Sequence, residues 1–144
     1  MRGGAIFAIA CLLGSCSGGT EVVPLLYDAC FSLDDCVEGA TLCEELVVEF
    51  SGLEYVNAIC TTECAVEGAT SPDCSRALIG RFGSCYPSSL AGGIDETLIC
   101  FEPCDTDANC LLGFRCLGAI DLCGANAADC PVSPNDAICV PGPD

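Results

Sequence analysis

The sequence predicts a small disulfide-rich, β-poor protein of three tandem cysteine-rich modules, each with a short β-hairpin. Sixteen cysteines occur among 144 residues, and at that density thiols are either paired in disulfides or bound to metal. From Cys30 onward the cysteines fall into three groups of four. In the first two groups, a small dipeptide lies midway between the third and fourth cysteines, where a hairpin turn would place these two opposite each other.

The first fifteen residues are typical of an export signal. Arg2 precedes an apolar stretch over residues 3–14, and small residues surround Ser15. A charged start, an apolar segment of about 7–15 residues and a small-residue cleavage site define such signals. The stretch is shorter than the roughly 20 apolar residues that a membrane-spanning helix needs. We therefore expect a signal peptide over residues 1–15 and export of the chain.

The four residues Leu13-Gly14-Ser15-Cys16 resemble the lipobox of bacterial lipoproteins, in which the cysteine is acylated and the chain is cut immediately before it. The resemblance implies a fatty acid such as palmitate on Cys16, a lipidated tether over residues 16–29 and attachment to a membrane through the lipid. Ser17 is unlike the aspartate that keeps some lipoproteins at the inner membrane, which favours the outer membrane or cell surface. The alternatives are a secreted protein, with Cys16 removed or paired, and a cytosolic protein with an apolar start.

An internal repeat begins at Cys30. Each second cysteine follows an acid or its amide and each fourth follows an isoleucine, and such recurrence at matching places predicts repeated structural units. We assign modules to residues 30–63, 64–103 and 104–144. Cys123 and Cys130 are left over; Cys130 could instead begin a truncated fourth unit, which would force disulfides between units.

Fourteen cysteines are expected to form disulfides, because modules this small bury too little apolar surface to fold unaided, and each bridge supplies about 2–4 kcal/mol. Four cysteines allow three pairings in each unit. We favour first to third and second to fourth. The fourteen are Cys30, Cys36, Cys43, Cys60, Cys64, Cys74, Cys85, Cys100, Cys104, Cys110, Cys116, Cys123, Cys130 and Cys139.

The first hairpin is expected to turn at Ser51-Gly52 and the second at Gly92-Gly93. Pro87 weakens the second, since proline cannot donate to a central ladder. The third hairpin needs a longer loop, which Cys123 and Cys130 could close.

Alternation along the first hairpin separates two faces. One face combines Cys43, Val47, Val56, Ala58 and Cys60 with the acids Glu45, Glu49 and Glu54. The other face is nearly all apolar, with Leu46, Val48, Phe50, Leu53, Tyr55 and Ile59. This apolar face either packs against the second module or binds a partner, including another copy of the chain. The candidate binding residues are Leu46, Val48, Phe50, Leu53 and Tyr55.

The run from Cys104 to Cys116, with its Cys-x5-Cys-x5-Cys spacing and Asn109 before the middle cysteine, resembles the cysteine-rich modules of the Dickkopf N-terminal and EB type. It also resembles the cysteine-rich repeat lipoproteins of Gram-negative bacteria. The resemblance extends from Cys30 to Cys139, although the second unit departs from it with nine residues between its first two cysteines. It implies a binding or structural role and carries over no catalytic residue.

The amino-acid composition argues against several classes of function. The chain has no histidine, the usual base for a nucleophile. It has no Cys-x2-Cys step, on which thioredoxin-like redox sites and zinc ribbons depend. Its net charge of −17 is unsuited to nucleic acid or anionic lipid. We therefore expect no enzyme and no nucleic-acid partner, and a role in binding an unknown protein or envelope component.

A calcium site is the remaining alternative. Asp105, Asp107 and Asn109 have the opening spacing of a calcium loop, but cysteines stand where an EF-hand requires glycine and glutamate. A smaller site helped by Asp121 would make the chain a cell-surface calcium- or metal-binding protein. We favour a structural role, in which these side chains turn a loop by bonding its backbone, and expect no cofactor.

Overall fold

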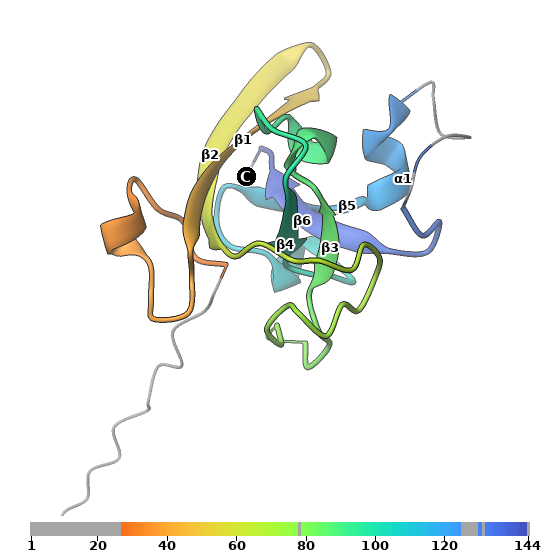
Figure 1. The fold of residues 1–144 in the computed structure, drawn as a ribbon. Coiled ribbons are helices and arrows are strands. Elements are labelled where there is room, and N and C mark those ends of the chain that lie inside the picture. The colour runs from red at the N-terminus through yellow and green to blue at the C-terminus, as the bar shows by residue number, and fades with distance from the viewer. Residues whose placement is uncertain (1–26, 78, 125–129, 131, 144) are drawn as a thin grey trace, which may run out of the picture.

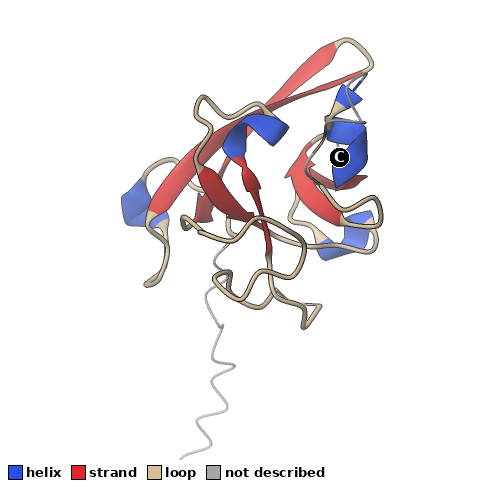
Figure 2. Cartoon of the chain, turned by 45° about the vertical axis from the view of Figure 1, so that its right-hand side comes forward, coloured by secondary structure: helices blue, strands red, loops and turns tan. Residues whose placement is uncertain are grey.

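The computed structural model describes residues 27–77, 79–124, 130 and 132–143 (Figures 1 and 2). The predicted signal peptide, Cys16 and most of the tether lie outside the described residues. The described chain forms three separate two-stranded antiparallel sheets with almost no helix. Seven disulfides join its cysteines. The predicted fold class is confirmed.

The three sheets are hairpins that follow one another along the chain. Their strands are β1 (Leu42–Phe50) with β2 (Leu53–Thr61), β3 (Ser84–Pro87) with β4 (Leu98–Phe101), and β5 (Phe114–Gly118) with β6 (Ala137–Pro141). The short helices are η1 (Leu33–Asp35), η2 (Ser88–Ala91), η3 (Asp107–Asn109) and α1 (Ala119–Leu122).

The first hairpin has the predicted turn and register. Cys43 lies opposite Cys60, and the strands meet at Ser51-Gly52. Both turn residues have positive φ, 53° at Ser51 and 79° at Gly52, as a two-residue hairpin turn of the primed type requires.

The second hairpin pairs its cysteines as predicted, with Cys85 opposite Cys100, but the two-residue turn at Gly92-Gly93 is wrong. The ladder ends at Pro87, which has no N–H to donate, and helix η2 follows at once. Gly92 instead ends η2 with a φ of 75° and lies against β1, where a Cβ would collide with the carbonyl oxygen of Val47.

The third hairpin places Cys116 opposite Cys139, and the Cys123–Cys130 bridge closes its long loop. The four-cysteine groups pair first to third and second to fourth, so the favoured connectivity is confirmed. The six bridges are Cys30–Cys43, Cys36–Cys60, Cys64–Cys85, Cys74–Cys100, Cys104–Cys116 and Cys110–Cys139. No bridge among the described cysteines joins two units, as a fourth unit beginning at Cys130 would have required.

The residue before each second cysteine has the same structural role in all three units. One oxygen of its side chain accepts hydrogen bonds from the backbone N–H groups of the two residues after the first cysteine. Asp35 accepts from Phe31 and Ser32 (2.9 and 2.8 Å), Asp73 from Ala65 and Val66 (3.1 and 3.3 Å), and Asn109 from Asp105 and Thr106 (2.9 and 3.0 Å). The recurring acid or amide therefore closes the first loop of each unit.

The isoleucine before each fourth cysteine also has a repeated role. The residue before the first cysteine of each unit forms an isolated antiparallel β-bridge to this isoleucine, so the entry segment lies beside each hairpin. The bridges are Ala29 to Ile59, Glu63 to Ile99 and Pro103 to Ile138. All three isoleucines are buried, and they meet in one core.

That core is shared by the three units. It combines Leu46 and Val48 of β1 with side chains from both other hairpins, namely Tyr86, Ile99, Phe101, Phe114, Ile138 and Val140. Two buried hydrogen bonds connect units: the Tyr86 hydroxyl donates to Asp136 (2.9 Å), and the Thr61 hydroxyl donates to the Cys100 carbonyl (2.6 Å). The repeats therefore form one packed body, in which the core side chains of each unit are covered by the others.

Candidate binding surface on the first hairpin

The first hairpin extends beyond the shared core. Its strands have nine residues each, whereas those of the other hairpins have four or five. Figures 1 and 2 show its turn projecting at one end of the molecule. Because a strand advances about 3.3 Å per residue, the turn end of the hairpin, beyond Val48 on β1, reaches past the elements that cover Leu46 and Val48.

The apolar face of this hairpin consequently divides into a buried and an exposed part. Leu46 and Val48 are 0% and 7% exposed, because η2 and β6 pack against β1. The structure places these two candidate binding residues in the core, out of reach of a partner, so the packing interpretation applies to them.

The other three candidates form an apolar tip, defined by Phe50, Leu53 and Tyr55. Leu53 is 62% exposed, and the two aromatic side chains are half-buried. The rings of Phe50 and Tyr55 meet edge to face with their centroids 5.8 Å apart. Leu53 is thus presented to solvent beside an aromatic pair, of which Phe50 also packs against the shared core.

The opposite face is acidic, and we call its members Glu45, Glu49 and Glu54 the glutamate face. All three are exposed, and Glu49 lies directly opposite Glu54 in the register. Like charges in that position destabilise a sheet. The ion pairs found in the described chain, Arg81–Asp105 and Arg115–Asp107, lie elsewhere. The fold therefore leaves this repulsion uncompensated.

A hollow adjoins the glutamate face between β2 and the loop after Cys30. Phe31, Glu45, Val56, Asn57, Ala58 and Cys30 line it. Phe31 is fully exposed and Val56 is 57% exposed. The bonds from Phe31 and Ser32 to Asp35 hold this loop, and they also lower the pKa of the Asp35 carboxyl. The alternation of the sequence placed Val56 on this face, but the position of Phe31 depends on the loop and was not predicted.

The calcium candidates have protein partners. Asp105 accepts a hydrogen bond from the Arg81 guanidinium (2.8 Å), and Asp107 accepts from Arg115 (2.9 Å) and from the Cys116 N–H (2.9 Å). The bond from Arg115 is the main reason that the pKa of Asp107 is lowered. The Asn109 oxygen closes the loop. Asp107 and Asn109 thus bond backbone N–H groups, as in the favoured structural role, whereas Asp105 bonds the Arg81 side chain. The groups of potential ligand atoms found among the described residues do not include Asp105, Asp107 or Asp121.

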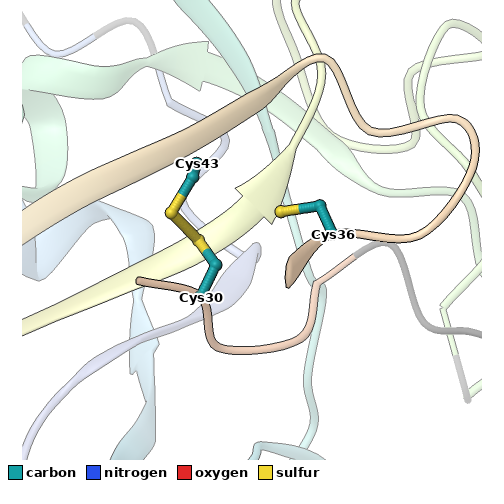
Figure 3. A group of neighbouring side chains, drawn as sticks. All are labelled: Cys30, Cys36 and Cys43. Atoms are coloured by element: carbon teal, nitrogen blue, oxygen red, sulfur yellow. A yellow bond between two sulfur atoms is a disulfide. The ribbon is translucent and has the colours of Figure 1, made fainter. Parts of the chain in front are cut away.

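The groups of potential metal ligands in the described part of the chain are cysteine sulfurs. In the first unit the sulfurs of Cys30, Cys36 and Cys43 lie within 4.8 Å of one another (Figure 3). The other two are Cys64, Cys74 and Cys100, and Cys104, Cys110 and Cys139. In each of these groups, the sulfurs are close together because the two disulfide bridges of the unit lie side by side. Each sulfur is bonded to another sulfur, so none is the thiolate that metal binding requires.

A buried carboxyl, Glu102, was missed by the sequence reasoning, because burial of one acid has no local signal. It lines a small cavity with Tyr27, Ile59, Leu111, Phe114 and Cys139. Burial, followed by the charge of Asp28, raises the pKa of Glu102 to about 7. The cavity measures about 10 Å³, which has room for about one water molecule. The cavity beside this carboxyl therefore has no room for a molecule much larger than water.

Comparison with protein-family models, with curated proteins and with solved structures finds no match. Within the described residues, no helix has the length and apolar character needed to cross a membrane. The candidate site defined by geometry is the first hairpin, with the apolar tip at its turn end on one face and the glutamate face on the other.

Proposed function

We propose that the chain is an exported, lipid-anchored protein with a non-enzymatic binding or envelope-structural role. In this proposal Cys16 carries the lipid that attaches the protein to the outer membrane or cell surface. The first hairpin then contacts a protein or envelope component. The observation that supports the binding role is the projection of the hairpin. It leaves Leu53 exposed on β2, while Leu46 of β1, on the same face of the hairpin, is fully buried.

Export is supported by the disulfides. Seven bridges indicate an extracellular or otherwise oxidising compartment, since cytosolic thiols are kept reduced. The lipid anchor rests on Leu13-Gly14-Ser15-Cys16 at the end of the apolar stretch. With a net charge of −17, the protein needs such a lipid to remain on an anionic membrane.

The non-enzymatic role is supported by the chemistry of the side chains. The fourteen described cysteines are in bridges, the chain has no histidine, and the buried Glu102 faces a cavity too small for a substrate. The surface offers a projecting apolar tip, and apolar side chains that remain accessible on a well-defined element are typical of contact surfaces.

The anchor is tested by expressing the full-length chain and its Cys16→Ala variant in a Gram-negative host fed a labelled fatty acid. We expect label on the wild-type protein in the membrane fraction, and an unlabelled variant in the soluble exported fraction. A wild-type protein without label, or a variant that stays in the membrane, contradicts the lipid anchor.

The binding role is tested by crosslinking the lipidated protein in its own envelope. We expect Leu53→Ser to remove the crosslinked species, and Leu112→Ser to leave them unchanged. Leu112 is the matched control because it is also a highly exposed leucine but belongs to the third unit. Crosslinks that survive Leu53→Ser, or that both variants remove equally, contradict the assignment to the tip.

A further inference from the structure

We infer that the glutamate face and the adjoining hollow form a docking site for a cationic, amphipathic polypeptide segment of a partner protein. This inference rests on the proposed binding function and specifies the chemistry of the partner. The partner supplies lysine or arginine side chains to the glutamates and apolar side chains to Phe31 and Val56.

The apolar part of the site is already exposed, with its backbone held in place, in the free protein. Phe31 is fully exposed and Val56 is 57% exposed, and neither belongs to the shared core or to the smaller cluster around Tyr27. The Phe31 backbone is held by the bond of its N–H to Asp35 and by the neighbouring Cys30–Cys43 bridge. Little backbone entropy remains to be lost when a ligand fills the hollow, which favours binding.

Among the residues that the structure describes, no basic side chain pairs with the charged part of the site. Glu45 lines the hollow itself, while Glu49 and Glu54 face each other across the strands. The chain has four basic residues, and the three described arginines act elsewhere. Two are paired with aspartates, and Arg76 lies over the Phe82 ring, 4.4 Å from its centroid. No described arginine relieves the charge of this face, and we assign that role to a partner.

Other occupants fit less well. A second copy of the chain brings the same acids, and of its described arginines two are in ion pairs and Arg76 lies against the Phe82 ring. An anionic lipid surface is repelled. A calcium ion would neutralise Glu49 and Glu54 but would leave Phe31 and Val56 exposed to water. A segment that combines cationic and apolar side chains satisfies both parts of the site.

The test uses the secreted full-length Cys16→Ser chain with its bridges oxidised. The probe is a fluorescent synthetic heptapeptide that alternates lysine with leucine. One control peptide alternates glutamate with leucine, and another alternates lysine with serine. We expect the lysine-leucine peptide to bind, with an affinity that falls as salt is raised. The lysine-serine peptide should bind at least about tenfold more weakly, and the glutamate-leucine peptide should not bind.

Variants of the protein locate the site. Phe31→Ser, and the double variant Glu49→Gln with Glu54→Gln, should each weaken binding by about tenfold or more. The control double variant Asp95→Asn with Glu96→Gln removes two exposed acids from the second unit and should leave affinity unchanged. Phe31, Glu49 and Glu54 are exposed, so folding is expected to persist, and the thermal unfolding midpoint verifies it.

Several results would overturn the inference. These are no binding of the lysine-leucine peptide, equal losses in the two double variants, no loss in Phe31→Ser, or equal binding of the lysine-serine peptide. If Phe31→Ser shows no loss and the lysine-serine peptide binds equally, and millimolar calcium displaces the peptide completely, the site is a simple cation site. If the peptide fails to bind while the envelope crosslinks still depend on Leu53, the binding function stands and this partner class is wrong. If the peptide binds but Cys16 carries no label, the site stands and the anchor is wrong.

Discussion

The division of the first hairpin into a buried and an exposed half predicts that two leucines on one face differ sharply in their effect on stability. Leu46 is 0% exposed, and Leu53 is 62% exposed. Truncation of a fully buried leucine to alanine costs about 3–5 kcal/mol, from lost burial and from the cavity that remains. Leu53 retains most of its contact with water in the folded state, so Leu53→Ala should lower the free energy of unfolding by no more than about 1 kcal/mol.

The two variants are compared by thermal and guanidinium unfolding with the bridges intact. A loss of about 3 kcal/mol lowers the unfolding midpoint by roughly 10 °C in a chain of this size. We expect such a shift for Leu46→Ala and a shift of about 3 °C or less for Leu53→Ala. Equal shifts in the two variants, or a Leu46→Ala protein as stable as wild type, would refute the shared core as the reason for the burial of β1.

Three further predictions concern polar groups that hold the fold. Asn109→Ala should lower the free energy of unfolding by about 1–2 kcal/mol, because two backbone N–H groups lose their acceptor. Asn109→Asp should retain most of the stability. Equal losses for the two variants in denaturant unfolding would contradict the role of Asn109 in closing the loop. Tyr86→Phe should cost about 1–3 kcal/mol, since buried Asp136 loses its donor, and an unchanged midpoint would contradict that bond. The pKa of Glu102 is raised from 4.5 to about 7, so the folded state holds this proton more tightly than the unfolded chain. The stability that protonated Glu102 contributes is complete below pH 4.5 and is lost as the pH rises through about 7. Glu102→Gln should remove this pH dependence and be more stable than wild type at pH 8, and parallel pH profiles would show the prediction to be wrong.

Much of each unit could be predicted because its determinants are local. The spacing of Cys43 and Cys60 about Ser51-Gly52 set the register, since a two-residue turn makes equidistant residues partners. The recurrence of an acid or amide before each second cysteine marked a residue with a common role, although its two backbone donors became visible only in the structure. A short loop between cysteines leaves few conformations, so spacing and one polar side chain determine most of it.

The arrangement of the units could not be predicted, because alternation shows which side chains share a face but not how deeply each is buried. Leu46 and Leu53 have equivalent places in the pattern, and only the packing of η2 and β6 distinguishes them. The close approach of Gly92 to β1 likewise depends on segments some 45 residues apart. The second turn was predicted wrongly for the same reason. Glycine is needed at position 92 because the backbone there lies against β1, and not because a hairpin turn is formed.

The hollow was missed because its walls come from separate elements. Val56 lies on β2, while Phe31 lies on a loop whose position depends on Asp35 and on the Cys30–Cys43 bridge. The sequence showed three glutamates on one face, but an acidic face alone is more often solvated than functional. The fully exposed aromatic ring beside it is what makes this face a candidate for binding.

Three units with one disulfide plan pack around one core and project the first hairpin. The most direct measurement is disulfide mapping of the native protein by mass spectrometry, after alkylation without reductant and proteolysis. We expect no alkylation from Cys30 to Cys139, and six linked pairs that join first to third and second to fourth cysteines, with Cys123 joined to Cys130. A bridge between two units, another pairing within a unit, or two or more alkylated cysteines in that span would contradict it.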